Sequence, residues 1–167
     1  MSLPLAAAGA VLLALLELSV APYLQVAGLK PDLVLIVVVS VASFSGLERA
    51  FAWAFVGGLM LDLLSAGPYR PVGATAFTLL IVAGLASITV RAFPSGRIAI
   101  AVLLVLVLAV LYHLLILSFV SLRGESATDP LGTILPIAVL DAVLAIPIAV
   151  FGFVAARRLQ AQEGLGW

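Results

Sequence analysis

The sequence predicts an all-α integral membrane protein, a bundle of six transmembrane helices. Hydrophobic residues make up 65% of the 167 residues and charged residues only 10%, and the mean hydropathy is +1.34. Soluble domains are roughly half apolar, so this chain has too little polar surface to cover itself. Its apolar residues are therefore expected to face lipid, in segments of about the length that crosses a bilayer.

Helix breakers divide the chain into segments that are predicted to form a single transmembrane domain. The predicted ranges are 3–20, 33–45, 50–65, 73–90, 98–122 and 131–156. Pro22 ends the first, because proline cannot donate to a continuing helix, and Asp32 is placed to cap the second. Gly46 separates the second from the third, Gly73 opens the fourth, and Pro94 precedes the fifth. A polar loop precedes the sixth.

The second and third segments are short. They offer about 13 and 16 residues, where a span usually needs about 17 to 25. They could form a re-entrant hairpin, but the connecting Glu48 and Arg49 would then lie at membrane depth. An ionised group costs at least about 2.5 kcal/mol there before pairing, so two short spans are favoured.

Basic residues near the segment ends predict that both termini are cytoplasmic. With the N-terminus inside, the inner side receives Arg49, Arg91, Arg97, Arg157 and Arg158, and the outer side receives Lys30, Arg70 and Arg123. An excess of basic residues marks the cytoplasmic side of a membrane protein.

Charge and cysteine content argue against several classes of function. The net charge is zero, so no nucleic-acid footprint is present, and there is no cysteine for a disulfide or a thiolate site. No metal-ligand spacing, cofactor motif or serine-hydrolase motif occurs. We therefore expect no catalytic residue, no metal, no cofactor and no enzymatic activity.

Four ionisable residues fall inside the predicted spans: Glu17, Asp62, His113 and Asp141. Glu17 and Asp62 lie about 5 Å from their helix ends at 1.5 Å per residue, so they are expected to reach water or to cap a loop. His113 and Asp141 both lie about 14 Å deep and are predicted to pair. The pair would be a structural bridge between the fifth and sixth helices, or alternatively a proton relay or a ligand-coordinating pair.

Small residues repeat every four positions along the third segment. Ala50, Ala54 and Gly58 form this stripe, and Asp62 continues it. Small residues let helix backbones approach closely in lipid. The stripe is predicted to pack inside the bundle or to receive a helix from another protein.

A short pattern of residues resembles the rod shape-determining protein MreD family. Pro31-Asp32-Leu33 opens one helix, a block containing Gly58, Asp62, Gly67 and Pro68 follows, and Gly73 opens the next helix. The pattern covers roughly residues 30–85, about a third of the chain.

The resemblance implies a non-catalytic scaffold of the bacterial cell-elongation machinery, in the plasma membrane. Its expected partner is the single-pass protein MreC, with MreB, RodA and the cell-wall transpeptidase in the wider assembly. The family resembles the six-helix fold of the substrate-binding S components of vitamin transporters. The alternative function is therefore a substrate-binding subunit of a small-molecule transporter.

Overall fold

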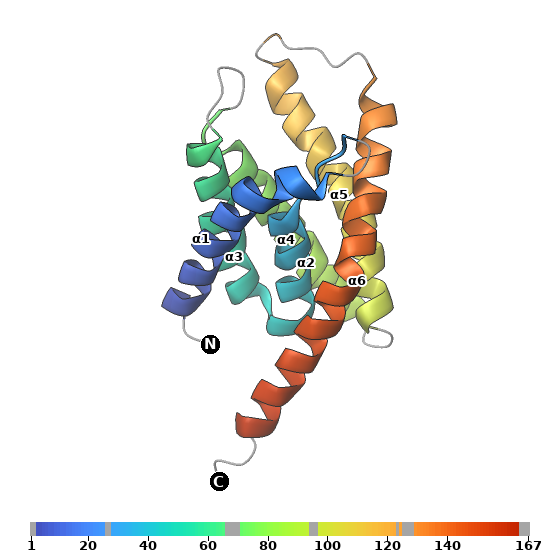
Figure 1. Ribbon diagram of the computed structural model, residues 1–167. Coiled ribbons are helices and arrows are strands. Elements are labelled where there is room, and N and C mark those ends of the chain that lie inside the picture. Colours follow the sequence, from blue (N-terminus) through green and yellow to red (C-terminus); the bar gives the residue numbers. More distant parts are fainter. Residues whose placement is uncertain are drawn as a thin grey trace.

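The computed structural model is all-helical (Figure 1). It describes residues 3–25, 28–65, 71–93, 97–122, 124 and 129–163. The helices are α1 (Leu3–Val20), α2 (Leu33–Ser45), α3 (Leu47–Leu64), α4 (Ala74–Ala92), α5 (Arg97–Ser121) and α6 (Pro130–Glu163), with a 3-10 helix, η1 (Ala21–Leu24), after α1. They occupy the six hydrophobic segments, but α3 begins at Leu47 and α6 continues to Glu163.

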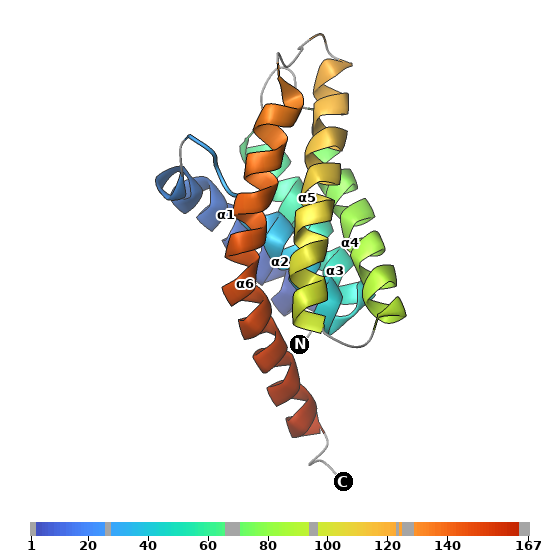
Figure 2. The same cartoon turned by 90° about the vertical axis from the view of Figure 1, so that its right-hand side faces the viewer.

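Helix α2 is the centre of the bundle. It packs against each of the other five α-helices, and ten of its 13 residues are buried. At 1.5 Å per residue it is about 20 Å long, well short of the roughly 30 Å of a bilayer core. Because α2 is so short, its start lies inside the bundle, beside the middle of α5 and α6, as Figures 1 and 2 show. Its free backbone N–H groups therefore need partners from the protein.

Large apolar side chains cover the outside of the bundle. Among the most exposed are Leu12 on α1, Ile88 on α4, Leu103 on α5 and Phe151 on α6. A soluble protein would bury such residues, whereas a membrane protein presents them to lipid. The described polar residues Glu17, Asp62 and Asp141 are instead buried.

Among the described residues, three helices are long and apolar enough to cross a membrane: Ala74–Ala92, Ile98–Ser121 and Pro130–Val154. Pro4–Val20 and Leu33–Ser45 are apolar but shorter. Helix α3 carries Glu48, Arg49 and Asp62 within its 18 residues. The structure thus supports a helical membrane protein, and the count of six spans stays a prediction.

Close contact between α3 and α4 depends on Gly58. A Cβ atom on Gly58 would lie 2.5 Å from Ala76 Cα and 2.7 Å from Ala76 N. Only glycine permits two backbones to come so near. Ala50 and Ala54 of the same stripe are fully buried, so these residues pack inside the bundle.

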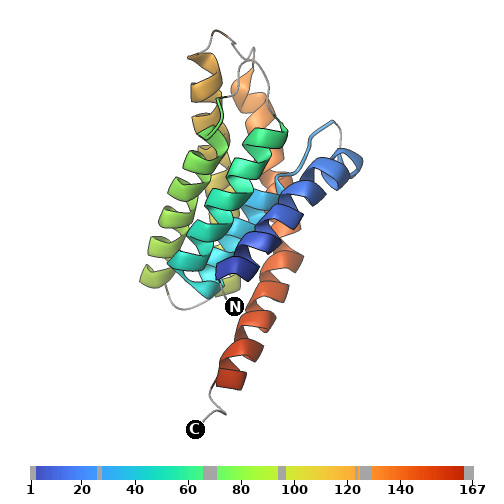
Figure 3. The same cartoon turned by 90° about the vertical axis from the view of Figure 1, so that its left-hand side faces the viewer.

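Helix α1 leans across the bundle beside α3 (Figure 3), and these two helices pack together. Ala6, Ala10 and Ala14 on α1 are fully buried. The start of α1 and the C-terminal half of α6 lie at the same end of the bundle (Figure 1).

Candidate functional site

Three carboxylates from different parts of the chain surround the start of α2. Asp32 Oδ1 accepts a hydrogen bond from Leu35 N at 3.1 Å, so Asp32 caps the helix as its position in the sequence predicts. Glu17 Oε2 on α1 accepts from Val34 N at 2.8 Å. Asp141 Oδ1 on α6 accepts from Asp32 N at 2.9 Å. Three backbone N–H groups around the helix start thereby find acceptors within the protein.

Two sources of positive charge lie next to the oxygens of this cluster. The N-terminus of a helix carries roughly half a positive charge, which stabilises nearby carboxylates. Lys30 adds an ion pair, with its Nζ 3.9 Å from Glu17 Oε1. Its side chain is 38% exposed, so this pair contributes little compared with the buried backbone hydrogen bonds.

Asp141 is the most enclosed member of the cluster. Its residue is 0% exposed, and its Oδ2 atom has no hydrogen-bond partner within the described part of the chain. Buried Pro31, directly before Asp32, has no N–H group and needs no acceptor. The hydrogen bond from Asp32 N to Asp141 Oδ1 ties α6 to the backbone at the start of α2.

Asp62 has the corresponding role at the start of α4. Its Oδ2 atom accepts from Gly73 N at 2.9 Å, Thr75 N at 3.0 Å and Ala76 N at 3.3 Å. Gly73 has a φ of 96°, a left-handed conformation that glycine adopts without strain. Asp62 thus joins the end of α3 to the first turn of α4. The intervening motif residues Gly67 and Pro68 lie outside the described residues.

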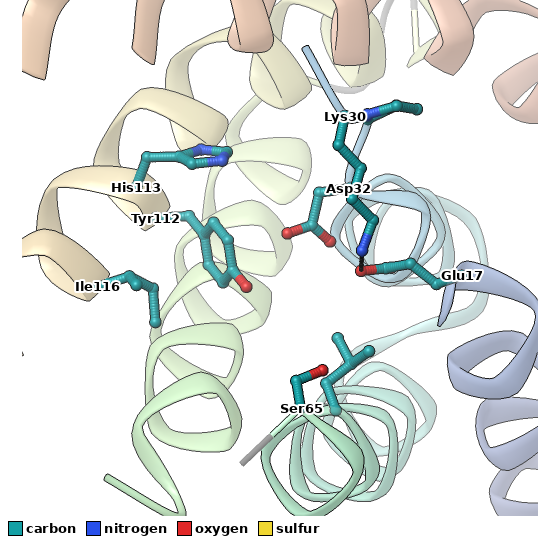
Figure 4. Close-up of a pocket in the computed structure, with 9 residues that line it drawn as sticks. Glu17, Lys30, Asp32, Ser65, Tyr112, His113 and Ile116 are labelled. Atoms are coloured by element: carbon teal, nitrogen blue, oxygen red, sulfur yellow. Dashed lines mark ion pairs between the residues drawn. The ribbon is translucent and has the colours of Figure 1, made fainter. Parts of the chain in front are cut away.

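A cavity of about 190 Å³ adjoins the cluster. In Figure 4, Glu17, Lys30 and Asp32 face Tyr112, His113 and Ile116 of α5 across it, with Ser65 from the end of α3 between them. Its lining is mixed, with two carboxylates, one lysine, one imidazole and one phenol. These groups suit water or a small polar group. No set of three or more metal-ligating side chains gathers within the described residues.

The predicted pair of His113 and Asp141 is wrong. The Nδ1 atom of His113 lies 2.8 Å from Ala109 O on its own helix, while Asp141 accepts from Asp32 N. Counting residues from the helix ends assumed that neighbouring helices end level. In fact α5 and α6 extend past the end of α1 and the start of α2 (Figure 2). Asp141 therefore meets a helix start before it can meet His113.

Glu17 was expected to reach water or to cap the next loop. It is only 4% exposed, and it accepts from Val34 N at the start of the next long helix. The convergence of Glu17, Asp32 and Asp141 was not predicted from the sequence. The available signal was the shortness of the second segment, which implies a helix start at membrane depth and hence a need for internal acceptors.

These carboxylates have a structural role as hydrogen-bond acceptors. Glu17, Asp32, Asp62 and Asp141 each accept at least one backbone hydrogen bond at a helix start. Asp62 and Asp141 serve different helices, α4 and α2. The arrangement holds helix ends together inside an apolar bundle.

Comparison with known proteins shows the family to which the chain belongs. No curated protein and no solved structure matches the chain significantly. Residues 5–157 match the family described as rod shape-determining protein MreD. The match includes the described residues at the starts of α2 and α4, and it extends from α1 into the last part of α6. The chain therefore belongs to the rod shape-determining protein MreD family, a family of membrane proteins that determine cell shape.

Proposed function

We propose that this protein is a non-catalytic scaffold of the cell-elongation machinery in the bacterial inner membrane, and that it binds partner membrane proteins through its helix faces. One observation carries the proposal: each buried carboxylate described above is engaged by a helix start, while the outside of the bundle is apolar. Carboxylates that accept backbone hydrogen bonds in this way are not available as catalytic groups. The apolar faces remain available for contacts within the bilayer.

A transporter subunit is a weaker interpretation of the same structure. Sites for small molecules usually enclose about 300 to 1,000 Å³, and the cavity beside Glu17 and Asp32 at the start of α2 holds about 190 Å³. Filling that cavity with a vitamin-sized ligand would displace the Lys30 and Glu17 side chains that line it. The polar lining supports a role in holding the helices together.

The expected partner is an MreC-type single-pass membrane protein, within an assembly that includes MreB, RodA and a transpeptidase. Its transmembrane helix would lie against the apolar outside of the bundle. Small residues and shape would decide that contact, because lipid is as apolar as the helix faces and hydrophobicity alone gives no preference.

We also infer that both termini are cytoplasmic. The five-to-three distribution of basic residues supports this orientation. The position of the start of α1 and the C-terminal half of α6 at one end of the bundle (Figure 1) supports it too. An alkaline phosphatase fused after Trp167 should be inactive, and a fluorescent protein fused there should be bright. The opposite pair of results would contradict the topology.

Co-purification tests the scaffold directly. The tagged protein, expressed with an MreC-type partner from the same genome, should retain that partner through detergent extraction, while an unrelated single-pass protein expressed at the same level should be lost. In parallel, a panel of vitamins is tested for thermal stabilisation of the purified protein. Loss of both single-pass proteins, together with stabilisation by one vitamin, would overturn the scaffold in favour of transport.

A further inference from the structure

A second polar pocket lies at the other end of α2 and α3 from the carboxylate cluster. The turn between α2 and α3 and the last turn of α4 form it, and its volume is about 420 Å³. Its lining residues are Ser45, Gly46, Leu47, Glu48, Arg49 and Arg91. The turn between α2 and α3 is at the same end of the bundle as the start of α1 (Figure 1).

Two arginines give this pocket an excess of positive charge. Neither Arg49 nor Arg91 forms an ion pair with a carboxylate of the described chain, where the ion pair present is that of Lys30 with Glu17. Glu48 also lines the pocket but is exposed. Two guanidinium groups and one carboxylate leave a net charge of about +1. Guanidinium groups bind phosphate oxygens through paired hydrogen bonds.

The start of α3 adds donors to the same pocket. The first helical hydrogen bond runs from Ala50 N to Gly46 O, and Gly46 supplies no side-chain cap. The N–H groups of Leu47, Glu48 and Arg49 precede that bond and are directed out of the helix end. The starts of α2 and α4 differ, because carboxylates of the protein occupy them.

The surroundings of the pocket suit an amphiphile. Phe51 lies one turn after Leu47 on α3 and is 39% exposed, and Ile88 lies nearly one turn before Arg91 on α4 and is 68% exposed. Apolar side chains therefore flank the arginines on the side toward the middle of the bundle, where lipid chains would run. We propose that this pocket binds the phosphate of an anionic phospholipid headgroup, with the acyl chains lying against Phe51 and Ile88.

The lipid should be anionic because Arg49, Arg91 and Glu48 together leave a net charge of about +1 in the pocket. A phosphate diester neutralises about one positive charge, and the neutral glycerol of phosphatidylglycerol adds none. The choline of phosphatidylcholine would instead place a cation beside Arg49 and Arg91. Each basic residue near an anionic lipid surface contributes about 1 kcal/mol, which corresponds to about a five-fold change in affinity.

The purified full-length protein in neutral detergent is titrated with phosphatidylglycerol, phosphatidylcholine or inorganic phosphate, and binding is followed by native mass spectrometry and thermal stability. Phosphatidylglycerol should bind best, with affinity about five-fold lower in Arg91→Gln and about 30-fold lower in Arg49→Gln with Arg91→Gln. Glu48→Gln, a matched control in the same pocket, should bind equally well or more tightly.

Three results would overturn the proposal. Equal binding of phosphatidylcholine would show that the arginines do not select charge. Unchanged phosphatidylglycerol binding by the folded double arginine variant would place the lipid elsewhere. Stabilisation of the wild type by inorganic phosphate alone, lost in the double variant, would identify a site for a soluble anion. If the double variant does not fold, Arg91→Gln alone decides, because Arg91 is an exposed residue in the last turn of α4.

Discussion

The starts of α2 and α4 have the same unsatisfied backbone donors, yet different parts of the chain satisfy them. At α4 one carboxylate, Asp62, accepts from residues 11, 13 and 14 positions later. At α2 the acceptors come from Asp32 itself, from Glu17, which lies 17 residues before Val34, and from Asp141, which lies 109 residues after Asp32. The first arrangement belongs to a helical hairpin, and the second depends on the packing of three helices.

The number of carboxylates at a helix start determines how much stability is lost when one of them is substituted. A local cap with three bonds on one atom has no substitute nearby, so its loss should affect the hairpin directly. At the start of α2, where three carboxylates share the capping, a substitution of one carboxylate removes only one hydrogen bond. The comparison therefore predicts a graded series of effects on stability.

Asp62→Ala should have the largest effect. It leaves the N–H groups of Gly73, Thr75 and Ala76 without their acceptor inside the bundle, at an expected cost of about 3 kcal/mol. Thermal unfolding in detergent measures this, and Asp62→Asn should lose less because its amide oxygen still accepts. Wild-type stability of Asp62→Ala would show that water or another group caps α4.

Gly58→Ala should come next. The added Cβ would meet the backbone of Ala76, in the first turn of α4, at 2.5 Å, so the α3–α4 contact must open at a cost of about 2 kcal/mol. Gly84→Ala is the matched control, because its Cβ would meet only the Phe51 ring at 3.9 Å. The control should be neutral or slightly stabilising. Similar losses in both variants would mean that close approach at Gly58 is not special.

The sequence predicted the helical segments and the local caps well. Hydrophobic runs between prolines, glycines and charges identify α1 to α6, and Asp32 after Lys30-Pro31 marks the start of α2. These signals are local, because helix periodicity and capping depend on neighbouring residues. The resemblance to the MreD family likewise came from a local motif around Asp32 and Asp62, and the family match over residues 5–157 confirms it.

The tertiary cluster was not predicted, for a physical reason. Placing Asp141 against Asp32 requires the relative heights of α2 and α6, and these depend on how far each helix extends past its neighbours. Residue counts from helix ends assume level ends and wrongly paired His113 with Asp141. The enclosure of Glu17 likewise depends on the lean of α1, which no local pattern records.

His113→Leu and Asp141→Leu should now have additive effects. Each side chain has its own partner, Ala109 O for His113 and Asp32 N for Asp141. Asp141→Leu should cost about 1 to 2 kcal/mol through the unpaired N–H of Asp32. The double variant should equal the sum of the single losses within about 0.5 kcal/mol. A double variant markedly more stable than that sum would restore the direct pair.

Lys30→Met should have the smallest effect, below about 1 kcal/mol, because the pair with Glu17 is long and partly exposed. The backbone bond from Val34 N keeps Glu17 in place. Thermal unfolding at low and high salt measures the contribution. A loss as large as that of Asp62→Ala would mean that Lys30 holds the cluster together.

Rod-shape complementation at matched protein levels tests most directly whether the carboxylates at the start of α2 serve structure alone. Glu17→Gln and Asp141→Asn keep an oxygen acceptor in each position but remove the acid. Each is expressed in cells that lack the native protein, at membrane levels matched to wild type by blotting. The account predicts rod-shaped cells for both variants. Round cells that contain normal amounts of a variant with wild-type thermal stability would contradict it and assign the acids a functional role.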